Sequence, residues 1–151
     1  MSNSLTDTVQ HDDKALCAYF DAPLRELSRR VVRVWFNHER LDEALSKTLQ
    51  PRLQYDLIYA IDTDGRQISS NVYKDSIDPG AYGQDLSQRP YSVPTAVLNN
   101  AAFRGVFVCD AYVSQVTERP CVTVLYGITS GPATLGFIAA DIDLSRLPDA
   151  L

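Results

Sequence analysis

The feature that most constrains this chain is a change of hydrophobic periodicity near Tyr55. Before that point, apolar residues from Leu24 to Leu49 recur mostly every three or four positions, which is the spacing of one helix face. After it, the apolar runs are dense or alternating and rich in β-branched and aromatic residues, as is typical of strands. Helix first and strands afterwards, within 151 residues, favours one α+β domain with an antiparallel sheet.

The helical part is predicted as one long helix over residues 13–49, after a flexible tail at 1–12. Pro23 fits the first turn of a helix and Asp21 can cap it, so the long helix can be broken there. Pro51 sets the end of the helix, because the residue before a proline avoids helical backbone.

Five antiparallel strands are expected after the helix. Their ranges are 55–61, 67–72, 106–115, 121–128 and 135–144. The sequence Asp-Thr-Asp-Gly at 62–65 predicts a turn that joins the first two strands into a hairpin. Residues 73–104 form an insert over one face of the sheet, with a short helix near 93–102, and inserts of this length are usually functional. The whole fold is one domain over 13–151.

Charge and hydropathy exclude several classes of function. Fourteen basic against nineteen acidic residues give a net charge of −5, which argues against a nucleic-acid-binding surface. No apolar run approaches the ~20 residues that cross a bilayer, and the polar N-terminus does not read as a signal peptide. We therefore expect a cytoplasmic protein, or an extracytoplasmic one if the chain is part of a larger protein. A disulfide between Cys109 and Cys121 is disfavoured in the cytoplasm.

Sequence patterns of enzymes and metal sites are absent. The chain has no G-x-S-x-G, phosphate-loop or H-E-x-x-H pattern, and His11 and His38 have no further ligand at metal-binding spacing. Asp62 and Asp64 resemble half of a calcium loop but lack its later ligands, so a side-chain-stabilised turn is the better interpretation. We predict no catalytic residue, no metal and no cofactor.

Four segments, in order, resemble PAS-like sensor domains of the PDC/Cache type. They are YDLIYAIDTDGRQISSNV at 55–72, GQDLSQRPY ending at Tyr91, VCDAYVSQVTERPCVTV at 108–124 and LGFIAADIDL at 135–144. The resemblance covers about residues 13–148, hence one lobe of such a sensor. It implies a five-stranded antiparallel sheet after a long helix, and a small ligand held between the sheet and the insert.

The resemblance also implies a set of ligand-binding residues. In amino-acid-binding members, residues matching Arg89 and Tyr91 hold the ligand carboxylate, while residues matching Tyr112 and Asp141 contribute to the ammonium site. The family's Asp two positions after the tyrosine is Ser114 here, which weakens the case for an amino acid. Alternation along the strand places Asp110, Tyr112 and Ser114 on one face.

Two questions stay open at the level of sequence. Asp141 either contacts a ligand or makes a structural bond to backbone or arginine, because a carboxylate in an apolar strand needs a partner. The domain is either a sensor for a small carboxylate or amino-acid-like molecule, or a PAS-like dimerisation or interaction scaffold without a ligand. A homodimer through the N-terminal helix is expected, because apolar residues cover more than one side of it, namely Val31, Val32, Val34, Trp35 and Phe36.

Overall fold

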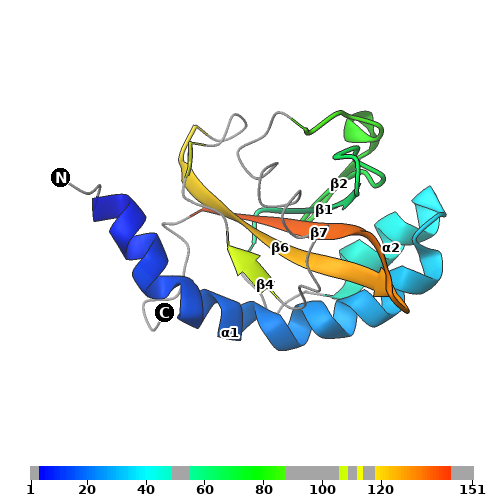
Figure 1. The fold of residues 1–151 in the computed structure, drawn as a ribbon. Helices are drawn as coiled ribbons and strands as arrows, with labels where there is room; N and C mark the ends of the chain where they lie inside the picture. Colours follow the sequence, from blue (N-terminus) through cyan, green and yellow to red (C-terminus); the bar gives the residue numbers. More distant parts are fainter. Residues whose placement is uncertain (1–3, 49–54, 88–105, 109–111, 114–117, 144–151) are drawn as a thin grey trace.

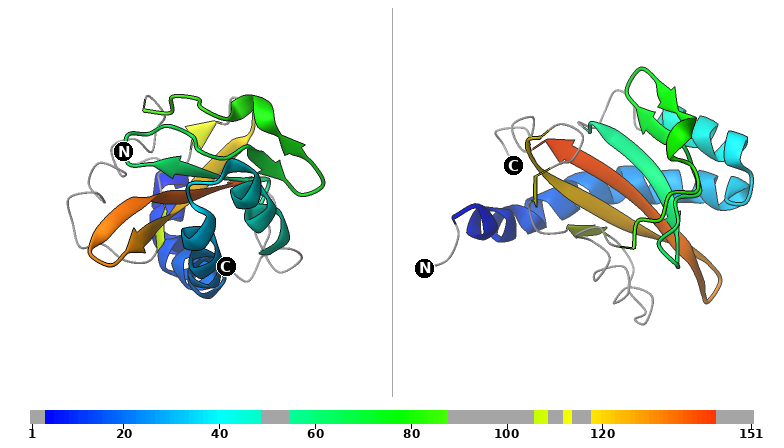
Figure 2. Two further views of the ribbon diagram at one scale, coloured as in Figure 1. Left: turned by 90° about the vertical axis from the view of Figure 1, so that its right-hand side faces the viewer. Right: turned by 90° about the horizontal axis from the view of Figure 1, so that it is seen from above.

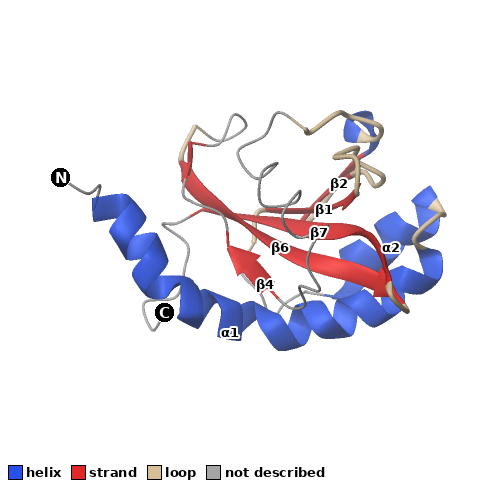
Figure 3. Ribbon diagram, in the orientation of Figure 1, coloured by secondary structure: helices blue, strands red, loops and turns tan. Residues whose placement is uncertain are grey.

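The computed structural model describes residues 4–48, 55–87, 106–108, 112–113 and 118–143 (Figure 1). Within them, two helices precede a seven-stranded antiparallel sheet, coloured by element type in Figure 3. The helices are α1 (Ser4–Val34) and α2 (His38–Thr48); the strands are β1 (Leu57–Asp62), β2 (Asn71–Tyr73), β3 (Ile77–Asp78), β4 (Val106–Val108), β5 (Tyr112–Val113), β6 (Pro120–Ser130) and β7 (Ala133–Asp143). A 3-10 turn, η1, covers Pro79–Ala81. The predicted α+β class is confirmed.

The strand order places the last strand of the chain in the middle of the sheet. The order is β3-β2-β1-β7-β6-β4, and β5 pairs with the far end of β6. β7 therefore has β1 on one side and β6 on the other. Residues of β7 are flanked by backbone on both sides, which fixes where their side chains project.

Both helices pack on one side of the sheet (Figure 2). The apolar stripe of α1 faces the strands and is almost fully buried. Its members are Phe20, Leu24, Leu27 and Val31, and Trp35, in the turn just after α1, continues it. Burying each such side chain contributes about 1.5–3 kcal/mol. α2 adds Leu41 and Leu45 to the same core. The opposite side of the sheet, which neither described α-helix covers, is called the helix-free face below.

The helical region differs from its prediction at three points. α1 begins at Ser4, where a flexible tail was expected, and it runs through Pro23 without a break. The break lies instead after Val34, where Asn37 starts α2 by accepting a hydrogen bond from the Arg40 N–H through its side chain, at 3.1 Å. The core explains this position, because the turn keeps Trp35 buried while α2 folds back onto α1.

The strand count differs from the predicted five because some segments divide. The strand expected at 106–115 contains two short strands, β4 and β5, on the same neighbour β6. The insert contributes β3, which extends the sheet beyond β2. The short helix expected at 93–102 lies outside the described residues.

The wide apolar arc at the end of α1 is largely covered within the chain itself. Val31 and Trp35 are buried, and Val32 and Val34 are half-buried against the same core. Only Phe36 stands out, with 89% of its surface exposed. This removes much of the reason for a helical dimer. Among the described residues, neither helix is both long and apolar enough to cross a membrane.

Candidate functional site

The helix-free face of the sheet carries the one predicted site residue whose side chain the structure describes. Cross-strand pairing puts Leu57 and Thr123 on either side of Asp141, so all three project to this face. A second apolar cluster surrounds them. It consists of Leu57, Tyr59, Ile61, Leu86, Leu125, Phe137 and Ala139, with Tyr73 and Phe107 at its margin. Leu86 comes from the insert, as expected for a segment that covers this face.

Asp141 is half-buried and oriented by its neighbour. Thr123 donates a hydrogen bond from its hydroxyl to Oδ1 of Asp141 at 2.8 Å, and Thr123 is fully buried. The backbone carbonyl of Asp141 accepts the N–H of Asp56 at 2.9 Å. The carboxylate thus has a partner of the kind that burial demands, the hydroxyl of Thr123.

Three further charged residues lie at the same end of β7, and sequence reasoning missed them. Asp143 is almost fully buried and lies 3.4 Å from Nη1 of the exposed Arg119. Its backbone N–H donates to Oδ2 of Asp56 at 2.8 Å. Alternation along β7 places Asp143 two residues from Asp141 on the same face, and this signal could have identified it. Negative charge therefore collects at this corner of the sheet.

The remaining predicted site residues are only partly placed. β5 pairs Tyr112 with Cys121, whose other neighbour is Asp143, so position 112 falls in the same corner. Its side chain is outside the description. Asp110, Ser114, Arg89 and Tyr91 lie outside the described residues. The helix-free face instead supplies apolar walls that the prediction did not name, among them Tyr59 and Phe137.

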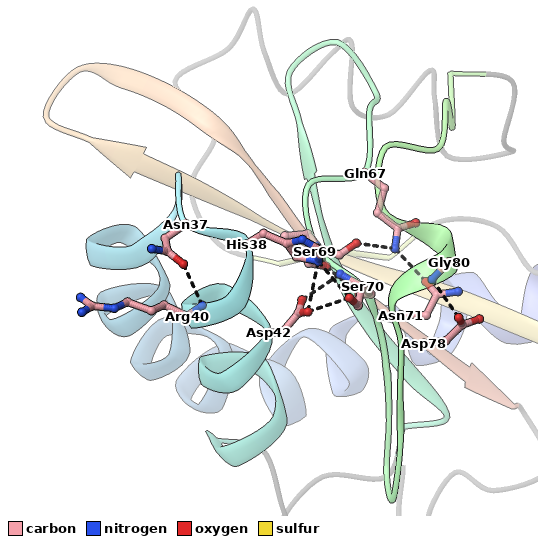
Figure 4. A network of polar contacts seen from close by, with 11 residues as sticks. Asn37, His38, Arg40, Asp42, Gln67, Ser69, Ser70, Asn71, Asp78 and Gly80 are labelled. Atoms are coloured by element: carbon pink, nitrogen blue, oxygen red, sulfur yellow. Dashed lines mark hydrogen bonds and ion pairs between the residues drawn. The ribbon is translucent and has the colours of Figure 1, made fainter.

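A second polar network joins α2 to the start of β2 (Figure 4). Asp42 accepts the backbone N–H of Ser70 at 2.8 Å and its hydroxyl at 2.6 Å. Nε2 of His38 lies 3.0 Å from the same hydroxyl and 3.2 Å from Asp42. The His38 ring also stacks on Tyr82, with centroids 3.9 Å apart. Sequence patterns do not predict this network, because its partners are 28 and 32 residues apart.

This Ser–His–Asp group is built for anchoring rather than for catalysis. Ser70 is fully buried, and its hydroxyl proton is directed at the Asp42 carboxylate. A nucleophilic serine instead gives its proton to the histidine, while the aspartate binds the other ring nitrogen. Here one nitrogen of His38 faces both partners. The network fixes α2 to the sheet edge.

The turn after β1 answers the question of a calcium loop. Oδ1 of Asp62 accepts the N–H groups of Asp64 and Arg66, each at 2.9 Å, and Gly65 has φ +85°. The carboxylate is therefore used within its own turn, as predicted. In the described part of the chain, no group of three His, Cys, Asp or Glu side chains is arranged to hold a metal ion. Cys109, the partner considered for a disulfide with Cys121, lies outside the described residues.

Solved structures share this arrangement of helices and sheet. The sensory domain of the Campylobacter jejuni chemoreceptor Tlp3 with isoleucine bound superposes with a TM-score of 0.61 at 14% identity, covering 93% of this chain and 55% of that one. The ligand-binding domain of Mlp24 with asparagine gives 0.60 at 15% identity, covering 95% and 57%. The chain has the PDC/Cache sensor fold. The family resemblance seen in the sequence is confirmed at the level of fold.

A solved structure that is not described as a chemoreceptor domain also resembles this chain. The Bacillus subtilis YkuI protein, described with an EAL domain and in complex with c-di-GMP and calcium, gives a TM-score of 0.64 at 19% identity. This chain covers 36% of that protein and between half and two thirds of the chemoreceptor domains. No family model and no curated protein sequence matches the chain.

Proposed function

We propose that this domain is a sensory module that binds a small amino-acid-like molecule or carboxylate on the helix-free face of its sheet. The observation that carries the proposal is the carboxylate of Asp141, held by Thr123 within an apolar surface. The neighbours that share the fold include sensory domains with isoleucine and asparagine bound. The domain acts as a binding module and not as an enzyme.

The chemistry of the face suits a zwitterion with an apolar side chain. Asp141 is positioned to accept hydrogen bonds from a ligand ammonium group, and charge-assisted bonds of this type are the strong ones. The buried cluster that contains Leu57, Tyr59 and Leu125 would form the apolar surroundings of the ligand's side chain. In this proposal, Arg89 offers its planar fork of donors to the ligand carboxylate, and Tyr91 forms a wall beside it.

A thermal-shift screen against amino acids and short carboxylates tests the proposal. A compound that binds only the folded state raises its melting temperature. For a hit that carries an amine, Asp141→Asn should weaken binding by at least about tenfold in calorimetry, because loss of one partner of a buried charge pair costs about 2–5 kcal/mol. Asp64→Asn, on the exposed turn after β1, is the matched control and should bind as the wild type does.

A scaffold without a ligand is the second candidate, and one observation favours it. Leu125 and Ala139 on the helix-free face are completely buried in the folded chain, as in a surface already filled by side chains. A scaffold would show no thermal shift with any compound and a concentration-dependent mass. A sensor would show a shift with at least one compound.

The predicted homodimer and the predicted compartment belong to the same proposal. The homodimer through α1 is tested by light scattering, in which a monomeric mass at high micromolar concentration would contradict it. Phe36 is the residue to examine first, because it is the exposed end of the apolar arc. The cytoplasmic location is tested by fractionation of the host cells.

A further inference from the structure

A positively charged groove of about 500 Å³ lies between α1 and α2. It is lined by Arg29, Arg30, Arg33 and Val34 of α1 and by Arg40, Glu43, Ala44 and Lys47 of α2. The lining carries a net charge of +4 in a chain of net charge −5, so the remaining residues sum to −9. The molecule is therefore strongly polarised, with cations gathered on one side of its helix pair.

Most of this positive charge is not neutralised within the domain. Lys47 binds Glu43 at 2.8 Å, and Arg30 is 3.8 Å from Glu26. In the part of the chain that the structure describes, Arg29, Arg33 and Arg40 form no ion pair. Arg29 and Arg33 are also one helical turn apart, where like charges destabilise a helix. The helix dipole favours Arg33 and Lys47, which lie in the last turns of α1 and α2, but it gives no reason for Arg29 or for Arg40, which lies in the first turn of α2.

The geometry of the groove selects among possible anionic occupants. The side chains of Arg30 and Lys47 are 58% and 68% exposed, so the groove is too open to enclose a small molecule, most of whose surface a ligand pocket buries. Nucleic acids and anionic membranes present extended negative surfaces that the rest of the domain, at −9, would repel. Two copies of the domain would not pair groove to groove either, because both grooves are positively charged.

A short acidic segment of a protein fits better than any of these. Arg40 and Lys47 are two helical turns apart, so cations line roughly 10 Å of the α2 wall. Val34 and Ala44, both half-buried, form an apolar floor between the charged walls. We propose that this groove docks an acidic, partly apolar peptide segment of a partner protein, with carboxylates against the arginines and an apolar side chain on the floor.

The position of the groove connects it to the rest of the domain. α2 carries Arg40 and Lys47 on the groove and Asp42 on the network that holds Ser70 (Figure 4). A partner bound in the groove thus contacts the helix that is anchored to the sheet edge. The groove does not overlap the helix-free face, so this proposal can fail while ligand binding holds, and the reverse.

Fluorescence anisotropy with a labelled acidic peptide of repeating Glu-Glu-Leu-Leu tests the proposal. Saturable binding to the full chain is expected, and it should weaken as salt is raised, because exposed charges are screened. The double variant Arg33→Gln/Arg40→Gln should weaken binding by about tenfold, since two exposed ion pairs contribute up to about 1 kcal/mol each. Glutamine keeps a high helix propensity, so the fold should be retained.

Arg25→Gln is the matched control, because Arg25 is an exposed cation of α1 that pairs with Asp21 outside the groove. It should bind the peptide within about twofold of wild type. Equal losses in Arg25→Gln and in the double variant would overturn the proposal, as would the absence of saturable binding. Binding to phosphatidylserine vesicles or to ATP in preference to the peptide would also overturn it and assign the groove to that ligand.

Discussion

Thr123 and Asp141, on adjacent strands β6 and β7, are joined by a hydrogen bond of 2.8 Å from the threonine hydroxyl to Oδ1 of the aspartate. The threonine is fully buried and the aspartate is half-buried. This bond restricts the carboxylate to one orientation on the helix-free face. A preoriented acceptor of this kind lowers the cost of ordering the site when a ligand binds.

Removing the hydroxyl of Thr123 should therefore weaken ligand binding without removing the carboxylate. Thr123→Val is expected to lower affinity about three- to tenfold for whichever amine-bearing compound stabilises the domain, because the carboxylate must then be ordered on binding. Thr123→Ser keeps the donor and should bind nearly as tightly as wild type. Calorimetry measures both, and equal affinities for all three proteins would contradict this role of Thr123.

The anchor between α2 and the sheet should make a measurable contribution to stability. Ser70→Ala removes the 2.6 Å bond to Asp42 from a buried position, and a loss of about 1–3 kcal/mol in the free energy of unfolding is expected. The control is Ser46→Ala in α2. It removes a hydrogen bond to the Glu43 carbonyl at the surface and should cost less than about 0.5 kcal/mol. Urea unfolding compares the two, and similar losses would argue against the anchor.

Gly136 of β7 should tolerate no side chain. A Cβ built there would fall on the carbonyl oxygen of Ile61 and lie 2.7 Å from Cζ2 of Trp35. Because backbone cannot give way easily, Gly136→Ala should cost about 3 kcal/mol or more. At Gly127 of β6 the nearest atom is Cε1 of Phe137 at 3.9 Å, so Gly127→Ala should be neutral or stabilise by up to about 1 kcal/mol. Denaturant unfolding of Gly136→Ala and Gly127→Ala measures both effects as changes in the midpoint, provided that the slopes equal that of the wild type.

The free energy of unfolding should fall at high pH, because Tyr126 loses its proton there. Burial, followed by the Asp21 carboxylate, raises the pKa of Tyr126 above 10.0, although a hydrogen bond with Ser28 acts in the opposite direction. A folded-state pKa above the unfolded value means that the contribution is present below pH 10.0 and is lost as the pH rises through the folded pKa. Melting curves of wild type and Tyr126→Phe should therefore converge or cross above that pH. Parallel curves would contradict it.

Local patterns in the sequence predicted the layers of this fold but not the contacts between them. The stripe from Leu24 to Trp35 and the strand at β7 follow from periodicity alone, and both are confirmed. The division of the helix at Asn37 depends on how α2 packs against α1, which no local pattern records. Pro23 suggested a break that tertiary packing overrides.

The candidate site was predicted in the same uneven way. Asp141 could be identified because a carboxylate in an apolar strand is costly without a partner, yet that partner, Thr123, appears only when β6 and β7 are in register. Asp56 and Arg119 reach Asp143 from other segments of the chain, 87 and 24 residues away. Long-range proximity of this kind cannot be derived from one sequence without its fold.

The central claim is that a small ligand binds to the helix-free face of the sheet, and alanine methyl NMR tests it most directly. Ala139 and Ala140 are consecutive, completely buried residues of β7 that project to opposite faces, the former into the cluster around Tyr59 and the latter into the helix-side core. On titration with a compound found by thermal shift, the methyl resonance of Ala139 should move, because its surroundings on the helix-free face change, while that of Ala140 stays in place. A shift at Ala140 without one at Ala139, or no shift at either, would contradict the account.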